Sequence, residues 1–130
     1  MMKWIQRLFK PPVDETELRI KELFQFLIDV YGFSYVKTDL GNLVDKSGKI
    51  IFYGPLYAYQ IFNNNLCINI VNLVQRDDYD IYITEKQTLD QHYIFDGLKL
   101  PSKLAYDLPL FSNQIKTELL SCKTIFGKDI

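Results

Sequence analysis

The chain has one histidine and two cysteines, and it lacks a glycine-rich phosphate loop. A lone His92 cannot build a multi-histidine metal site, and no Gly-x-Ser-x-Gly sequence places a serine for a histidine-based catalytic triad. Neither Cys67 nor Cys122 belongs to a Cys-x-x-Cys pair, so zinc binding and thioredoxin-like chemistry have no support. We therefore expect a protein that is not an enzyme and that holds no metal and no cofactor.

An excess of positive charge is also absent. With 15 Lys and Arg residues against 16 Asp and Glu residues, the formal net charge is −1, and no basic face large enough to neutralise many phosphates is visible. This balance argues against nucleic acid as the main partner. The chain begins without the apolar segment of a secretory signal, so we expect a cytoplasmic protein. Both cysteines are then expected to be free and buried, with a Cys67–Cys122 bridge as the less favoured alternative.

No residue from Ile50 to Gln75 is charged, yet this stretch does not read as a membrane span. Its polar side chains would each need a partner in hydrocarbon: Gln60, Asn63, Asn64, Asn65, Asn69 and Asn72. Apolar residues alternate instead, over Tyr57–Asn63 and again over Leu66–Leu73, which predicts two adjacent antiparallel strands at the centre of a sheet. The alternation changes phase near Val71, which predicts a β-bulge there.

Two segments have the spacing of amphipathic helices. The first is Asp14–Tyr31, where Asp14 and Glu17 form a capping-box-like pair and Gly32 is a suitable stop. The second runs from Ser112, as its N-cap, to Phe126.

Shorter patterns predict the remaining strands. They are Phe33–Lys37, a hairpin of Leu43–Val44 with Lys49–Tyr53 around Gly48, and Tyr79–Thr84 with Ile81 and Ile83 facing inward. We expect Gly54-Pro55 to break the strand that precedes it, because proline has no N–H for a ladder. Residues 85–110 are irregular, with a single turn expected at Ser102–Tyr106.

These elements predict one α+β domain spanning residues 1–130. Its sheet should be an antiparallel meander of about four to six strands, with the N-terminal and C-terminal helices packed on one face. The other face should carry tyrosine and asparagine rather than charge.

Residues 1–12 form a short basic amphipathic segment that ends at Pro11-Pro12. Its functional interpretation is a weak contact of residues 1–10 with a membrane surface, because Trp4 and Phe9 stand beside Lys and Arg. Its structural interpretation is a turn or two of helix on the domain, or a frayed end. We favour the structural one, since so short a helix is marginal in water.

An acidic group follows the uncharged stretch and consists of Asp77, Asp78, Asp80 and Glu85. It does not match the EF-hand calcium loop, and nothing beyond the presence of acids supports a glycosidase-type carboxylate pair. The favoured interpretation is a solvated turn and strand edge. The functional alternative is an electrostatic patch that steers a basic protein partner.

Tyrosine is common in the predicted strands, at Tyr53, Tyr57, Tyr59, Tyr79 and Tyr82. These residues are either half-buried in the sheet or part of an exposed aromatic face of the kind found in protein interfaces. Base stacking on such a face would lack a basic groove. The candidate partner-binding residues are therefore Asp77, Asp78, Asp80, Tyr57, Tyr59, Tyr79 and Tyr82.

The order of features resembles that of small bacterial immunity proteins, which neutralise secreted or contact-delivered toxins. The similarity covers roughly residues 14–85 and rests on Ile28-Asp29-Val30-Tyr31-Gly32-Phe33, Tyr57-Ala58-Tyr59-Gln60-Ile61, Ile68-Asn69-Ile70 and Arg76-Asp77-Asp78-Tyr79. The resemblance implies a non-enzymatic protein that blocks a toxin's active site, with acids meeting a basic cleft and tyrosines as buried anchors.

Two alternatives stay open. The first is a small cone-shaped α+β ligand-binding protein or enzyme with a pocket lined by Tyr and Asp. The second is a structural or regulatory component held at the membrane by residues 1–10.

Overall fold

The computed structural model describes residues 14–45, 47–73, 79–86, 94, 97–101 and 107–130, and it does not describe the side chains of 43, 44, 51–55 and 73. The predicted Ser102–Tyr106 turn and the segment at residues 1–12 lie outside the described residues. The elements in chain order are α2 (Glu15–Tyr31), β1 (Ser34–Val44), β2 (Ile50–Phe62), β3 (Cys67–Leu73), β4 (Tyr79–Thr84), β5 (Leu98–Lys99), α5 (Leu108–Cys122), β6 (Thr124–Ile125) and β7 (Lys128–Asp129).

Helix α2 is confirmed at both predicted ends. The Asp14 carboxylate accepts a hydrogen bond from the Glu17 backbone N–H at 3.0 Å, which caps the first turn. Gly32 follows the helix with a φ of 73°, a left-handed conformation that glycine adopts without strain. The buried side of α2 is formed by Ile20, Phe24 and Leu27.

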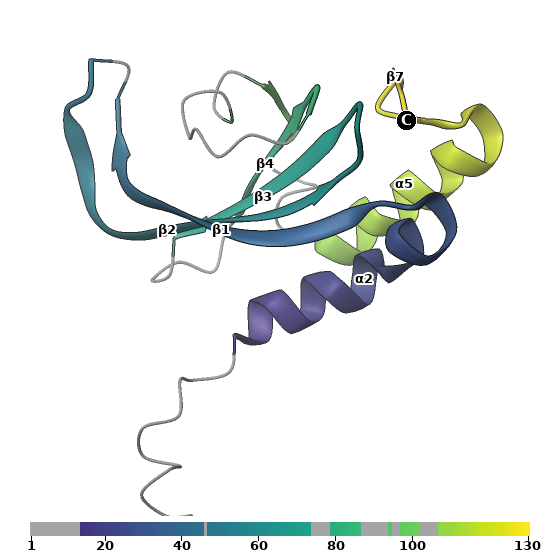
Figure 1. Ribbon diagram of the computed structural model, residues 1–130, viewed down its shortest axis with the longest axis horizontal. Helices are drawn as coiled ribbons and strands as arrows, with labels where there is room; N and C mark the ends of the chain where they lie inside the picture. The colour runs from purple at the N-terminus through teal and green to yellow at the C-terminus, as the bar shows by residue number, and fades with distance from the viewer. Residues whose placement is uncertain (1–13, 46, 74–78, 87–93, 95–96, 102–106) are drawn as a thin grey trace, which may run out of the picture.

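The five-stranded sheet has the order β1-β2-β3-β4-β5, and every neighbouring pair is antiparallel. Helices α2 and α5 lie side by side beneath this sheet (Figure 1), and the Phe24 and Phe111 rings meet between them with centroids 5.5 Å apart. The predicted α+β fold, an antiparallel meander with an N-terminal and a C-terminal helix on one face, is therefore confirmed.

The uncharged stretch forms the β2–β3 hairpin, as predicted. Its turn is held by Asn63, whose side-chain oxygen accepts hydrogen bonds from the backbone N–H groups of Asn65 and Leu66 at 2.9 and 2.8 Å. This local bonding is what asparagine provides in turns.

Both faces of the central strands are buried, which explains why this stretch excludes charge. On the helical face, the sheet contributes Tyr59, Ile61, Ile68, Ile70, Ile81 and Ile83 to the main core. On the far face, a smaller cluster consists of Leu56, Ala58, Val71, Tyr82 and Ile94. The far face carries the polar residues Gln60 and Asn69, but it also carries the charged residues Asp80 and Lys99. The prediction of tyrosine and asparagine rather than charge on this face is therefore wrong in part, and Tyr57, Tyr59 and Tyr79 lie on the helical face.

Several strand predictions are wrong. The predicted strands at Phe33–Lys37 and Leu43–Val44 belong to one continuous strand, β1, and Leu98–Lys99, within the stretch predicted to be irregular, forms β5. β2 runs through Gly54-Pro55, because the pairing is irregular there: β1 advances from Gly41 to Leu43 while β2 moves from Leu56 to Phe52. A bulge tolerates a proline, because a residue at this position does not have to donate a backbone hydrogen bond to the neighbouring strand. β3 has no bulge at Val71, since its register with both neighbours is regular; the residue is buried on the far face.

The C-terminal helix begins and ends earlier than predicted. Its N-cap is Asp107, whose side chain accepts from the Leu110 N–H at 3.0 Å, and the chain leaves the helix at Lys123 with a φ of 55°. Ser112 is therefore not the cap: it is buried in the second turn, and its hydroxyl donates to the Leu23 carbonyl of α2 at 2.7 Å. Phe126 lies in the β6–β7 hairpin.

Both cysteines are free, so the alternative of a bridge is not realised. Cys67 is buried as predicted, but Cys122 is exposed at the end of α5. In the described part of the chain, no helix combines the length and the apolar character needed to cross a membrane.

Candidate functional site

The structure divides the predicted partner-binding residues between two faces. Tyr57, Tyr59 and Tyr79 lie on the helical face, while Tyr82 and Asp80 lie on the far face. Tyr59 is 3% exposed and Tyr82 is 6% exposed, so neither ring can meet a partner without rearrangement. Tyr57 and Tyr79 are partly exposed. Asp77 and Asp78 lie outside the described residues.

Asp80 is an exposed residue of β4, and its carboxylate lies 3.7 Å from Lys99 Nζ on β5. Burial of the neighbouring Tyr82 ring, together with the Asp80 charge, raises the pKa of Tyr82 to about 12. This phenol therefore stays protonated at neutral pH.

A polar junction joins the start of α2 to the sheet. The second oxygen of the Asp14 carboxylate accepts hydrogen bonds from Lys37 Nζ at 2.7 Å and from the Tyr59 hydroxyl at 2.8 Å. One turn later, Glu17 accepts a hydrogen bond from the Tyr35 hydroxyl at 2.6 Å. We call these five residues, Asp14, Glu17, Tyr35, Lys37 and Tyr59, the helix–sheet junction.

The protonation states within the junction reinforce one another. Burial acts to raise the pKa of Asp14, but the hydrogen bonds from Lys37, from the Glu17 N–H and from Tyr59 outweigh it and lower that pKa. The hydrogen bond to Asp14 raises the pKa of Lys37. Burial, and then the hydrogen bonds to carboxylates, raise the pKa values of Tyr59 and Tyr35. Each group thus keeps its ordinary form at neutral pH, and the junction fixes α2 on the sheet.

Next to the junction, one row of residues crosses the sheet in register. Asp39 pairs with Tyr57, Tyr57 with Asn72, and Asn72 with Tyr79. The Lys37 ammonium lies over the Tyr57 ring, 4.4 Å from its centroid. We call Tyr57, Asn72 and Tyr79 the tyrosine–asparagine row.

Asn72 is the unusual member of this row. It is 8% exposed, and among the described residues its side-chain oxygen has no hydrogen-bond partner. A buried polar atom without a partner costs free energy, so this oxygen is a candidate contact for a donor from another molecule. Two partly exposed tyrosine rings stand on either side of this acceptor.

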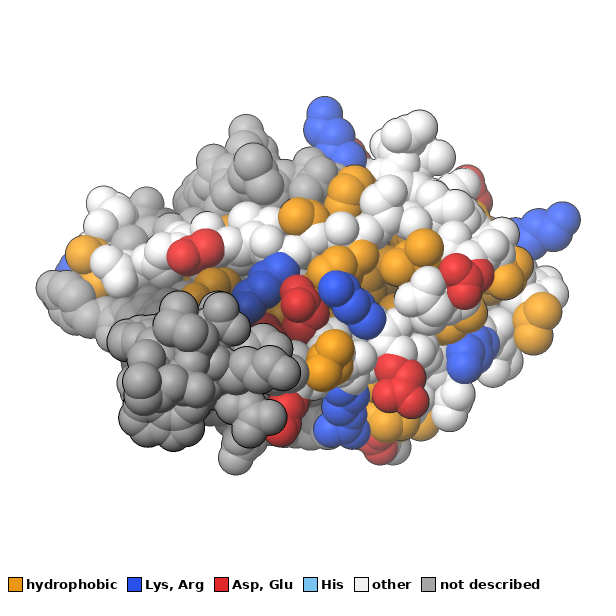
Figure 2. Space-filling view, turned by 60° about the horizontal axis from the view of Figure 1, so that its bottom comes forward, with side chains coloured by type: hydrophobic (Ala, Val, Ile, Leu, Met, Phe, Trp, Pro, Cys, Tyr) orange, Lys and Arg blue, Asp and Glu red, His pale blue; other side chains and the backbone are white. Residues whose placement is uncertain are grey.

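The helical face mixes charges of both signs. Figure 2 shows Lys and Arg side chains interspersed with Asp and Glu side chains and with apolar surface, rather than gathered into a patch of one sign. A partner that bound here would contact aromatic rings and local ion pairs, and it would not meet an electrostatic field of one sign.

The far face holds a buried chain of polar side chains. Thr38 donates to Gln60 at 2.8 Å, Gln60 donates to Asn69 at 2.8 Å, and Asn69 donates to the Tyr82 carbonyl at 3.2 Å. Because these groups hydrogen-bond to one another, their polar atoms are paired inside the protein and do not point to a ligand site. Burial raises the pKa of the nearby Cys67 thiol to about 12, which makes that thiol unreactive.

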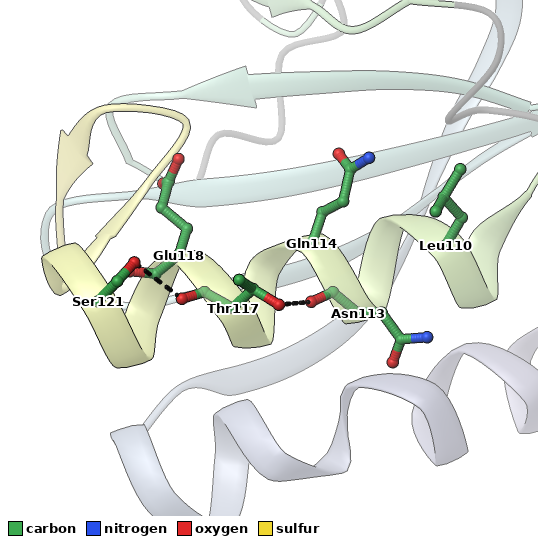
Figure 3. Close-up of a pocket in the computed structure, with 6 residues that line it drawn as sticks. All are labelled: Leu110, Asn113, Gln114, Thr117, Glu118 and Ser121. Carbon is green, nitrogen blue, oxygen red and sulfur yellow. Dashed lines mark hydrogen bonds between the residues drawn. The ribbon is translucent and has the colours of Figure 1, made fainter.

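Two hollows occur on the helices. One, of about 500 Å³, runs along α5 and is lined by Leu110, Asn113, Gln114, Thr117, Glu118 and Ser121. Figure 3 shows that the Thr117 and Ser121 hydroxyls bond to carbonyls of their own helix, at 3.0 Å each, so they do not converge on a ligand. The other, of about 620 Å³, lies where α2, α5 and the C-terminal residues meet and is lined by Tyr31, Leu119, Leu120, Lys123, Asp129 and Ile130.

Across the described ranges, no group of three or more His, Cys, Asp and Glu side chains could hold a metal ion. Comparison of the chain with protein-family models, with curated proteins and with solved structures found no match. The resemblance to immunity proteins therefore stays a prediction.

Sequence reasoning missed the binding partners of Asp14 and the unpaired oxygen of Asn72. One signal was available for Lys37, because strand alternation places it on the same face as Tyr35. The opposite placement of Tyr82 and Tyr59 follows from the register of β2, β3 and β4, which local patterns do not fix.

Proposed function

We propose that this chain is a non-enzymatic protein-binding module, and most concretely a cytoplasmic bacterial immunity protein that binds and blocks a toxin. The observation that carries the proposal is the tyrosine–asparagine row: a buried amide oxygen that no described residue pairs, between two partly exposed tyrosine rings. Tyrosine is a frequent anchor in protein interfaces, since it buries a large ring and still offers a hydroxyl.

The row stands on a rigid base, which suits it to binding. Tyr59 lies two residues from Tyr57 on the same face of β2 and bonds to Asp14. Lys37, which also bonds to Asp14, lies over the Tyr57 ring, so this ring should lose little further freedom when a partner arrives. A donor from the partner would bond to the Asn72 oxygen. Asp80 lies on the other face of the sheet, so it would act only at long range, together with Asp77 and Asp78 as predicted from the sequence, by speeding the approach of a basic toxin domain.

The test begins with affinity capture of the partner from the native host, followed by binding kinetics with the purified pair. Tyr57→Ala and Tyr79→Ala should each speed dissociation by about tenfold or more, because each removes a central ring. Tyr31→Ala is the matched control, since Tyr31 is also partly exposed but lies at the far end of α2. For an immunity protein, the captured partner's toxic activity should be blocked by equimolar wild-type protein.

A second arm of the same experiment addresses the acids. Changing Asp77, Asp78 and Asp80 together to Asn should slow association and flatten its salt dependence without changing folding. Normal binding by both tyrosine variants would exclude the tyrosine–asparagine row as the interface. A captured partner without an activity that the protein blocks would exclude the immunity role.

A further inference from the structure

β1 is an outer strand of the sheet, and its free edge is long. Among the described residues only β2 pairs with it, although β1 has 11 residues. At the opposite end of the sheet, β5 has only two residues. Figure 1 shows the blue β1 ribbon running from the end of α2 to the long hairpin that it forms with β2. A free strand edge presents unpaired N–H and C=O groups that another strand can use.

The side chains of β1 leave this edge accessible. Lysine commonly guards free edges, and Lys37 is exposed, but its ammonium lies over the Tyr57 ring of β2 and bonds to Asp14 instead of covering the free backbone of β1. An ammonium has three donors, so Lys37 can still face a carboxylate across this edge. On the other face of the strand, Val36 and Leu40 are partly exposed apolar side chains. They would gain burial from a neighbouring strand.

The sequence of β1 is complementary to itself when reversed. We propose that a second copy of this chain pairs antiparallel with β1 around a twofold axis at Thr38. This register sets Lys37 opposite the partner's Asp39, and Val36 opposite the partner's Leu40, with each contact occurring twice. Opposite charges and apolar pairs directly across antiparallel strands are both stabilising.

The charges select this register over its neighbours. Side chains keep their face only if the register shifts by an even number of residues. A shift of two residues in one direction sets Lys37 against Lys37, and a shift of two in the other sets Asp39 against Asp39. Like charges directly opposite are destabilising, so the register centred on Thr38 is favoured.

The same strand also limits the assembly to two copies. The pairing of β1 becomes irregular after Asp39, and Gly41 has a φ of 75°, so the straight run ends there. A twofold pairing uses the same edge on both copies and closes the assembly. This edge adjoins the tyrosine–asparagine row at Tyr57, which pairs with Asp39, whereas Tyr79 lies on β4, away from the edge, so Tyr79 is the member of the row that reports on partner binding apart from self-association.

Sedimentation of the full chain over a wide concentration range tests the proposal. Wild-type protein should show a monomer–dimer equilibrium, and Asp39→Lys should raise the dimer dissociation constant about tenfold or more by setting two lysines opposite each other at both contacts. Asp39→Asn should raise it by about threefold to tenfold. This variant keeps the acceptor for the Gly41 N–H, which Asp39 bonds at 2.8 Å, and so preserves the local turn.

Glu85→Lys is the matched control, because it changes the charge equally at an exposed site just after β4. It should leave the dimer unchanged. A wild-type protein that stays monomeric through the millimolar range overturns the proposal, and so does a dimer that Asp39→Lys does not weaken.

The register has its own test in a Cys122→Ser background, which removes the exposed native thiol. Val36→Cys and Leu40→Cys chains should form a covalent dimer under mild oxidation when mixed, and much less when each is oxidised alone. Equal cross-linking in all three samples overturns the register centred on Thr38.

Discussion

Asp14 shows how one side chain can organise two distant parts of a chain. Its carboxylate caps α2 through the Glu17 N–H and also accepts hydrogen bonds from Lys37 and Tyr59, which lie 23 and 45 residues away in the sequence. The helix cap and the anchor of the helix on the sheet are thus the same residue. Its contribution to stability should therefore depend on its charge.

Asp14→Asn should keep the helix cap and remove only the negative charge, because asparagine caps a helix about as well as aspartate. The pKa of Asp14 is lowered below 3.8, so its stabilising charge is fully present above that value and is lost as the pH falls through the lowered pKa. The pKa of Lys37 is raised above 10.5, so the contribution of its charge is present below that value and is lost as the pH rises through the raised pKa.

We expect the free energy of unfolding of Asp14→Asn to be reduced at neutral pH. Its acid decline between about pH 5 and pH 2 should be shallower than in the wild type. Chemical denaturation across a pH series measures this, with Glu15→Gln, an exposed acid of the same first turn, as control. An identical acid decline in wild type and Asp14→Asn would contradict the role of the charge.

At the scale of elements, α2 presents one apolar side to both the sheet and α5. Leu27 is fully buried, Leu23 is partly buried against the main core, and Leu18 is 56% exposed. The Ser112 hydroxyl of α5 bonds to the Leu23 carbonyl, which ties the two helices at their point of contact. The three leucines of this helix thus differ in how deeply their side chains are buried.

Replacing these leucines by alanine should follow their burial. Leu27→Ala should cost about 2–5 kcal/mol through lost transfer free energy and the cavity that remains, and Leu23→Ala should cost less. Leu18→Ala should stay within about 0.5 kcal/mol, as for other surface changes. Denaturant melts of the three variants provide the measurement, and a small effect at Leu27 would mean that the buried side of α2 lies elsewhere.

For the whole molecule, the N-terminal helix α2 carries its own N-cap at Asp14. The basic residues 1–10 are separated from that point by Pro11-Pro12 in the sequence. The fold should therefore not depend on the first ten residues.

Deleting Met1–Lys10 should change the free energy of unfolding by no more than about 0.5 kcal/mol. It should slightly reduce any binding to vesicles of anionic lipid, because it removes three positive charges, Lys3, Arg7 and Lys10. Circular dichroism melts and vesicle sedimentation test the two parts. Loss of folding on truncation would mean that the segment belongs to the core.

Local signals sufficed for α2 and for the β2–β3 hairpin, where the decisive contacts lie a few residues apart. Asp14, Glu17 and Gly32 mark the ends of α2 through bonds within one or two turns, and the asparagine turn at Asn63 sets the β2–β3 hairpin in the same way. The prediction of Ser112 as a cap was wrong because the bond that its side chain makes joins residues far apart in the sequence. Serine suits both a cap and a buried hydrogen bond, and only the approach of α2 decides between them.

The sequence by itself determined the α+β class, the N-terminal helix and the central uncharged hairpin, because periodicity and capping act over short stretches of chain. The tertiary structure decided which tyrosines are buried, which face each strand turns to the helices, and that no described residue pairs with the side-chain oxygen of Asn72. These outcomes depend on register between strands and on contacts such as Asp14–Tyr59, between residues that are distant in the sequence. A pattern read along one strand carries no information about which neighbour will cover it.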